Sequence, residues 1–202
     1  MQNAKSMMIC SAIIGGMSDR SPRIADAEDF LRERGAADIA HTGGTLMDHL
    51  RRVVDLLDEW GASVEGQLAG LCHASYSTDG FAVNLIEIAE RSRLLDVIGL
   101  EAEASVYLYA SCDRGYTYPL LGTFPVEFRD RFSGELSWPD LRAVDIFMEI
   151  SAANELDVMT HNRELALKYA DSLGRLFMRG HDHLTPPAQE AWSSLTISVD
   201  PR

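Results

Sequence analysis

The sequence is poor in the features that would connect it with nucleic acid or a membrane. Lys and Arg number 18 against 31 Asp and Glu, which gives 202 residues a net charge of −13, and no basic cluster interrupts this acidic background. A surface this acidic repels phosphate backbones. No apolar run is long enough to span a bilayer. We therefore expect neither nucleic acid nor a membrane as a partner.

Cysteine is also scarce. Cys10, Cys72 and Cys112 are an odd number without the spacing of a metal-binding knuckle. This usage fits buried, reduced thiols better than a disulfide framework. The apolar stretch at 7–14, which follows Lys5, only weakly resembles a signal peptide and lacks a clear cleavage site. A cytoplasmic location is the resulting expectation.

Strand alternation and internal repeats are missing, and so are phosphate-binding loops, nucleophile elbows and dinucleotide-binding fingerprints. What the sequence has is helical periodicity bounded by capping residues and glycines, in a chain that is 46% hydrophobic. The predicted helices cover residues 27–34, 46–60, 64–76, 82–97, 100–112, 139–157, 161–178 and 186–195. We predict an all-α bundle of about eight helices, forming a single domain over 25–202 behind an N-terminal arm, residues 1–24.

Two segments depart from this helical pattern. The arm carries the apolar patch at 7–14 without charges that would discourage association, so a homodimer is expected. Between 113 and 138, Pro and Gly interrupt any periodicity. Long irregular loops in compact domains are often functional, so this second segment is a candidate part of a site.

Two histidines fall on the inward sides of adjacent predicted helices. By helical spacing His49 shares a face with Leu46 and Val53, and His73 lies late on the next helix. Neutral imidazoles in such positions can begin a metal site, because they bind Zn, Fe and Mn. The alternative is a pair of buried histidines that are hydrogen-bonded to backbone or carboxylate.

Further candidates lie close to this pair in the sequence. His41 precedes Gly43-Gly44, which allows a tight turn that would bring its ring over the pair. Tyr76 follows His73 by about one helical turn, so it is predicted either to act as acid, base or hydrogen-bond donor or simply to pack. Asp79 is either a turn residue, which we favour, or a carboxylate of the site.

The irregular segment supplies candidates for substrate contact. Arg114 is either the positive charge that meets an anionic substrate or one half of a bridge at a helix end. Tyr116 and Tyr118 are candidates for the wall of a pocket entrance.

The stretch from His49 to His73, HLRRVVDLLDEWGASVEGQLAGLCH, resembles the first half of an HD-type metal-dependent phosphohydrolase. In that superfamily the second histidine is followed by an aspartate, and a later helix supplies another. Ala74 and Asn154 stand at those positions here. Because carboxylates hold hard cations and help activate water, the resemblance implies the fold more strongly than the hydrolase activity. The HD dipeptide within 181–183 lies outside this frame and is expected to be a loop.

A closer resemblance lies in the strings HTGGTLMDHL and WGASVEGQLAGLCHASYSTDGF. These look like a family of uncharacterised, HD-related proteins from bacteria, fungi and plants, in which the HD aspartate is commonly replaced. The resemblance implies an HD-like scaffold without naming a reaction. It places Asn154 as an amide that orients substrate.

Together these features predict a small-molecule enzyme with a histidine-lined central pocket. The predicted catalytic residues are His41, His73, Tyr76 and Asn154. The predicted substrate contacts are Arg114, Tyr116 and Asp79. The predicted metal ligands are His49 and His73, with Zn or Fe favoured over Mn. Three functions stay open. The first is metal-dependent hydrolysis and the second is iron-dependent oxygenation. The third is metal-free, either binding of a small molecule or acid–base catalysis without a cofactor.

Overall fold

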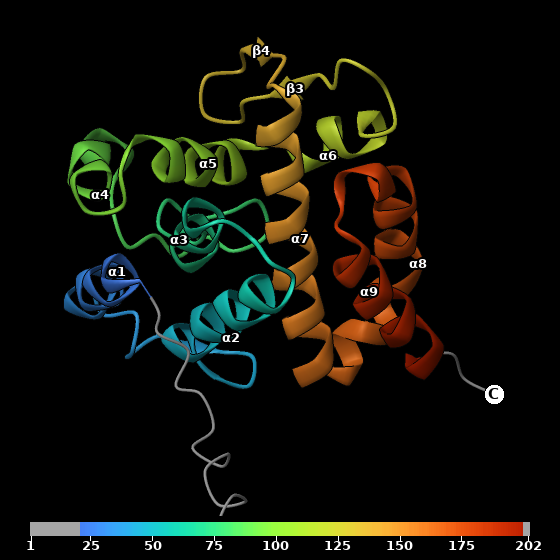
Figure 1. The fold of residues 1–202 in the computed structure, drawn as a ribbon, viewed down its shortest axis with the longest axis horizontal. Helices are drawn as coiled ribbons and strands as arrows, with labels where there is room; N and C mark the ends of the chain where they lie inside the picture. Colours follow the sequence, from blue (N-terminus) through green and yellow to red (C-terminus); the bar gives the residue numbers. More distant parts are fainter. Residues whose placement is uncertain (1–20, 200–202) are drawn as a thin grey trace, which may run out of the picture.

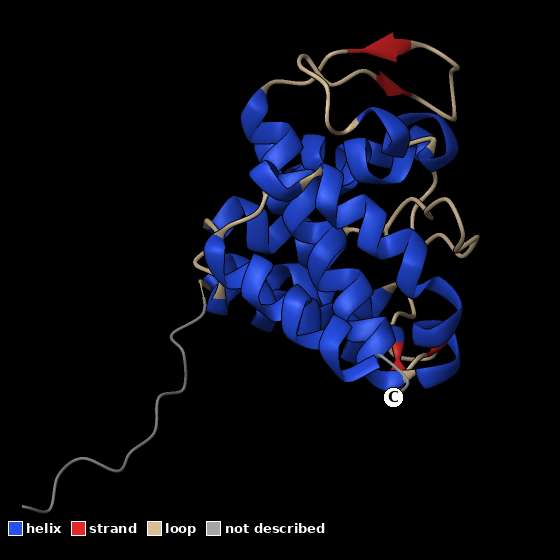
Figure 2. Cartoon of the chain, turned by 90° about the vertical axis from the view of Figure 1, so that its right-hand side faces the viewer, coloured by secondary structure: helices blue, strands red, loops and turns tan. Residues whose placement is uncertain are grey.

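The protein is described by a computed structural model that covers residues 21–199 (Figure 1). These residues form one mostly helical domain of nine α-helices and two small antiparallel hairpins, which confirms the predicted fold class (Figure 2). Most of the predicted N-terminal arm, including the apolar patch at 7–14 on which the homodimer prediction rests, lies outside the described residues.

The helices are α1 (Pro22–Glu33), α2 (Leu46–Glu59), α3 (Val64–Cys72), α4 (Arg91–Ile98), α5 (Leu100–Ser111), α6 (Arg114–Thr117), α7 (Leu141–His161), α8 (Arg163–Arg179) and α9 (Pro186–Val199). One hairpin pairs β1 (Ala40–His41) with β2 (Gly44–Thr45), and the other pairs β3 (Phe128–Arg129) with β4 (Leu136–Ser137). Three short 3₁₀ turns, Ile88–Glu90, Tyr118–Leu120 and His181–His183, complete the described elements.

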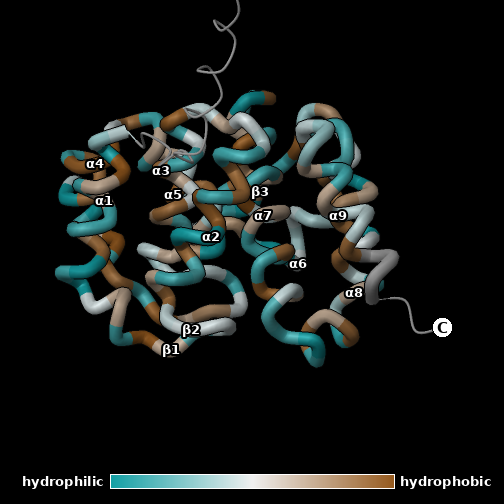
Figure 3. Tube along the Cα trace, turned by 60° about the horizontal axis from the view of Figure 1, so that its bottom comes forward, coloured by the Kyte–Doolittle hydropathy of each residue, from teal (hydrophilic) through white to brown (hydrophobic). Residues whose placement is uncertain are grey.

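Helix α7 runs through the middle of the molecule. Helices α2, α3 and α5 pack on one side of it and α8 and α9 on the other, so α7 is covered from both sides (Figure 1). Hydrophobic and hydrophilic residues alternate along the surrounding helices, as expected when each helix buries one stripe (Figure 3). Within residues 21–199, no helix has the length and apolar character needed to cross a membrane.

The α2–α3 pair is the best predicted part of the fold. The Thr45 side chain accepts from the backbone of Asp48, whose carboxylate accepts from the Thr45 backbone in return, so α2 begins with a capping box. Leu50 and Leu57 on α2 are fully buried. A side chain at Gly70 on α3 would clash with Leu57 Cδ1, so glycine is what lets the two helices approach this closely.

Two helix boundaries differ from the prediction for local reasons. Helix α1 begins at Pro22 rather than at Ala27, because proline is well suited to the first turn of a helix and does not mark a linker here. Helix α3 ends at Cys72 rather than near Tyr76. The ring Nδ1 of His73 donates to the Gly70 carbonyl oxygen, which the continuing helix would otherwise use.

Two segments have a different secondary structure from the one predicted. Only Arg91–Ile98 of the predicted 82–97 helix is α-helical, because the backbone N–H groups of Leu85 and Ile86 are anchored on the Ser75 carbonyl. The segment at 113–138 was predicted to be irregular, yet it contains α6 and the β3–β4 hairpin. The strands are two residues each, too short to show an alternating pattern in the sequence.

Candidate functional site

A cavity of about 710 Å³ lies beside α7, within the range of sites that hold small organic molecules. Its lining comes from the β1 hairpin, α2, the end of α3, the 78–81 turn, α6, α7 and α8. Histidines gather at its β1–α2 side, Arg114 projects from α6, and apolar side chains of α8 form a wall. The cavity is therefore polar on one side and apolar on the other.

Three histidines form a continuous stack in this cavity. The His41 and His49 ring centroids are 4.2 Å apart, and those of His49 and His73 are 5.4 Å apart with the rings nearly perpendicular. The β1–β2 turn has positive φ angles at Gly43 and Gly44, a conformation that glycine adopts readily, and it carries the ring of His41 onto that of His49. Residues far apart in the sequence thus share one face of the cavity.

His49 is held by two residues of α7. Its Nδ1 donates to Asp157 Oδ2 at 2.6 Å, and its Nε2 lies 3.1 Å from Asn154 Oδ1. Arg52 donates to both Asp157 oxygens, at 2.6 and 3.0 Å. Burial would raise the pKa of Asp157, but the hydrogen bonds from His49 and Arg52 outweigh it and hold that pKa at about 2. Asp157 is therefore ionised at neutral pH.

The same contacts orient the ring of His49. An ionised carboxylate can only accept, so Nδ1 of His49 carries a proton that is directed at Asp157. On the other side of the ring, Nε2 faces the amide oxygen of Asn154, whose amide nitrogen lies 3.2 Å from Glu155 Oε1. His49 is thus fixed from both sides by residues of α7.

His73 has a different arrangement. Its Nδ1 donates to the Gly70 carbonyl oxygen at 2.7 Å, so Nε2 is the nitrogen that keeps a lone pair. Burial and the neighbouring charge of His49 lower the pKa of His73 to about 3. Burial and His49 likewise lower the pKa of His41 to about 4, and the buried Nδ1 of His41 has no hydrogen-bond partner. Both rings are neutral at neutral pH.

Arg114 faces the cavity from the first residue of α6, a helix capped by the Asp113 side chain. Its Nη2 donates to the Tyr109 hydroxyl at 3.2 Å, and its Nη1 lies 3.8 Å from Glu155 Oε1. The guanidinium carbon lies 5.4 and 5.9 Å from the ring centroids of Tyr109 and Tyr118. A guanidinium has five N–H donors, so these contacts leave much of its capacity for a ligand.

The structure brings most of the predicted site residues together. The cavity is lined by His41, His49, His73, Asp79, Arg114 and Asn154. Asp79 belongs to the 78–81 turn, as favoured, and its carboxylate accepts from the Arg114 backbone N–H at 3.2 Å, while its role in substrate contact stays a prediction.

Tyr76 and Tyr116 are not among the lining residues, which corrects their predicted placement. The Tyr76 hydroxyl donates to the buried Glu103 at 2.8 Å. The prediction assumed that α3 continues past His73, and the chain turns there instead. The Tyr116 hydroxyl donates to Glu127 on the outer side of α6.

Sequence reasoning missed several residues of the site. Asp157 and Glu155 were not among the predicted site residues, yet Asp157 is the buried partner of His49 and Glu155 lines the cavity. A signal for Asp157 was present, because it follows Asn154 by three positions and so shares its helical face. Arg52 and Tyr109 carried no signal, because their roles depend on partners that are distant in the sequence.

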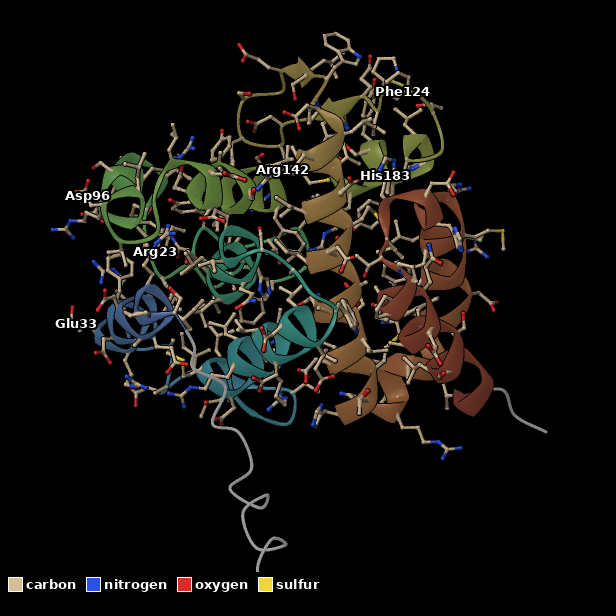
Figure 4. The ribbon with its side chains drawn as sticks, in the orientation of Figure 1. Arg23, Glu33, Asp96, Phe124, Arg142 and His183 are labelled. Carbon is tan, nitrogen blue, oxygen red and sulfur yellow. The ribbon has the colours of Figure 1, made fainter. Side chains whose placement is uncertain are left out.

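The donor set does not fit a metal centre. The Nδ1 of His49 faces Asp157 and its Nε2 faces Asn154, while the Asp157 oxygens are shared between His49 and Arg52. Across the part of the chain that the structure describes, no group of three or more His, Cys, Asp and Glu side chains is placed to hold a metal ion. His183, which follows the His181-Asp182 dipeptide, lies at the junction of α8 and α9, where it bonds to Asp145 at 2.8 Å (Figure 4).

Comparison with known proteins gives one match. Residues 30–114 match the model of a domain of unknown function, DUF6817. This segment includes His41, His49, His73 and Arg114 and stops before the α7 residues of the site. The match does not connect the chain with the HD superfamily, so HD-likeness stays a prediction. No curated protein and no solved structure matches the chain.

Proposed function

We propose that the cavity is the active site of an enzyme that performs general acid–base catalysis on a small molecule. His73 is the base and His49 is the acid. The observation that carries the proposal is that two adjacent histidines have different hydrogen-bond partners, a carboxylate for Nδ1 of His49 and a backbone carbonyl for Nδ1 of His73. Neighbouring titratable groups in different environments are the usual basis of such a division of roles.

The Nε2 atoms of the two lining histidines, His49 and His73, could together take one proton from a substrate and return one to it. Nε2 of His73 takes a proton from one atom of the substrate, and Nε2–H of His49 gives a proton to another atom. The substrate is thereby isomerised without a change in composition, and solvent exchange restores both histidines. In this step the substrate replaces Asn154 Oδ1 as acceptor of the His49 proton, so Asn154 holds the acid in position beforehand.

Asp157 and Arg52 are positioning residues in this scheme. Asp157 fixes the ring orientation of His49 through the hydrogen bond to Nδ1, as a carboxylate does for a catalytic histidine. Arg52 holds both Asp157 oxygens and also donates to the Thr42 carbonyl at 3.1 Å, which connects α7 with the β1–β2 turn that carries His41.

Metal-dependent hydrolysis and iron-dependent oxygenation have less support in this geometry. Both need side chains that are free to coordinate, and the polar atoms of His49 and Asp157 are already used in hydrogen bonds. Ligand binding without catalysis is the remaining alternative, and turnover distinguishes it from the proposal.

The test is solvent hydrogen exchange into a panel of 2-oxo and 3-oxo carbonyl compounds in D₂O, followed by proton NMR. We expect the protein to accelerate exchange for at least one compound, and His73→Ala to reduce the rate by roughly 10²–10⁴. His181→Ala is the matched control, because this exposed histidine lies outside the cavity. Exchange that is undiminished in His73→Ala, or absent throughout the panel, would contradict the proposal.

A further inference from the structure

We propose that the substrate of this site is a small organic acid with an apolar portion, whose anionic group is bound by Arg114. Its reacting carbon lies a few bonds away beside His73, and its apolar portion lies against α8. The inference rests on the proposed acid–base function and adds the chemical class of the molecule on which it acts.

Arg114 carries the first part of the argument. Its side chain is four-fifths buried, and its direct partners are a tyrosine hydroxyl and a carboxyl oxygen at 3.8 Å. A buried guanidinium with unused donors is matched by an oxyanion, which accepts two parallel hydrogen bonds. The protein as a whole is strongly acidic, so this local charge is what would draw an anion into the cavity.

The nearby carboxyl groups do not cancel this charge. Glu155 Oε1 lies 3.8 Å from Arg114 Nη1, which is beyond hydrogen-bond distance, and burial raises the pKa of Glu155. Asp79 is engaged by the Arg114 backbone N–H, so its carboxylate faces the start of α6.

Tyr109 links Arg114 to the base. Its ring lies 5.2 Å from that of His73, centroid to centroid, and its hydroxyl accepts from Arg114. Arg114 and His73 thus contact the same tyrosine, one at its hydroxyl and the other at its ring, and both line the cavity. We infer that a molecule held by Arg114 presents a carbon near its anionic group to His73.

The side chains of α8 that line the cavity are suited to contact the apolar portion of the substrate. Leu165, Tyr169, Leu173 and Leu176 recur at helical spacing and all line the cavity. Phe81 lines the cavity from the 78–81 turn, and the centroid of its ring lies 5.5 Å from that of the His41 ring. A purely polar metabolite would leave this surface without a partner, whereas an aryl or alkyl group would cover it.

Binding of an anion also makes the base stronger. Among the neighbours of His73, His49 and Arg114 both lower its pKa by their positive charge. An anion on Arg114 offsets that charge and raises the basicity of the ring. Catalysis should therefore depend on the charge of the substrate in kcat as well as in KM.

The experiment is isothermal titration of the full-length protein with three probes. 3-Phenylpropionate has both features, 3-phenylpropionamide lacks the charge, and propionate lacks the ring. We expect 3-phenylpropionate to bind at least about tenfold more tightly than either of the other two, because the amide loses the charged contact with Arg114 and propionate loses the apolar contact with α8.

Variants of Arg114 test whether this residue binds the anionic group of 3-phenylpropionate. Arg114→Gln should weaken 3-phenylpropionate about tenfold or more and leave the amide unchanged, and Arg114→Lys should fall between, because it keeps the charge but loses the planar fork. Arg175→Gln, at an exposed position of α8, is the matched control and should bind as the wild type does. Circular dichroism of each variant verifies folding.

Equal binding of acid and amide, no binding of the acid, or an unaffected Arg114→Gln would overturn the inference. The His73→Ala variant distinguishes a failure of the anion subsite from a failure of the proposed acid–base function. His73→Ala should still bind 3-phenylpropionate with preference for the charged form. If that preference is observed while the exchange assay fails, the anion subsite is supported and the acid–base reaction is not.

Discussion

The molecule contains two buried polar clusters that differ in how fully their hydrogen bonds are used. In the closed cluster, Tyr76 donates to Glu103 at 2.8 Å, and Arg91 makes two bonds of 2.7 Å to the same carboxylate. Arg91 also lies 3.7 Å above the Tyr107 ring. None of these side chains lines the cavity. The closed cluster has little capacity left for a ligand.

The open cluster consists of His41, His49, His73 and Arg114, and it retains unused capacity. The buried Nδ1 of His41 has no partner, the lone pair on Nε2 of His73 is available, and most Arg114 donors are uncommitted. A buried polar group that lacks a partner costs free energy, so proteins keep such groups mainly where a ligand will meet them. Unused hydrogen-bonding capacity beside a cavity, rather than burial of polar residues alone, is therefore the basis on which we propose the site.

The largest expected effect comes from the closed cluster. Glu103→Ala leaves Arg91 without its carboxylate and Tyr76 without its acceptor, and breaking a buried ion pair in this way costs roughly 3–5 kcal/mol. Urea unfolding should report that loss. Binding of 3-phenylpropionate to the folded variant should match the wild type, and a changed affinity would show that the two clusters are coupled.

The next largest expected effect is a dependence of the free energy of unfolding on pH, which arises from the histidines of the open cluster. Burial and His49 lower the pKa of His73 to about 3 and that of His41 to about 4, whereas in the unfolded chain histidine titrates near 6.5. Between these values the unfolded chain binds more protons, so the free energy of unfolding falls as pH drops below about 6.5. Each histidine contributes up to about 1.4 kcal/mol per pH unit over this window.

Urea unfolding between pH 7.5 and pH 4.5 measures this dependence. His73→Gln should flatten the pH profile, and His181→Gln, at an exposed position, should not. A His73→Gln profile as steep as that of the wild type would mean that His73 takes up its proton over the same pH range in the folded and the unfolded protein, which would contradict the lowered pKa.

The smallest effect distinguishes the clusters most directly. Tyr76→Phe removes one hydroxyl but leaves both Arg91–Glu103 bonds, so we expect a stability loss of about 1 kcal/mol. Thermal unfolding reports the loss, and the solvent-exchange rate should equal that of the wild type. A large drop in exchange would restore the catalytic role first predicted for Tyr76.

Local chemistry explains which elements the sequence predicted well. The Thr45–Asp48 capping box and the spacing of Leu46, His49 and Val53 defined α2 almost to the residue. Ser63 likewise began α3 as expected. The β3–β4 hairpin was missed because its strands are two residues long, and the end of α3 was missed because a side chain of His73 takes over a backbone acceptor.

The candidate site was partly predictable for the same reason. His41, His49, His73 and Arg114 were identified because residue type and short-range spacing suggest chemistry without knowledge of partners. Tyr76 was misplaced because its predicted direction required the helix to continue.

By itself the sequence determined the helical class, the caps, the apolar faces and a group of histidines that would meet near one another, all of which depend on residues within a few turns. The tertiary structure decided which polar atoms are used in internal hydrogen bonds and which remain available to a ligand. Asp157 lies 108 residues from His49 and bonds to it at 2.6 Å, and Arg114 lies 41 positions from His73 yet shares Tyr109 with it. Such pairings depend on how α2, α5, α6 and α7 pack, because hydrogen bonds and pKa values respond to distances of a few ångströms that no local pattern encodes.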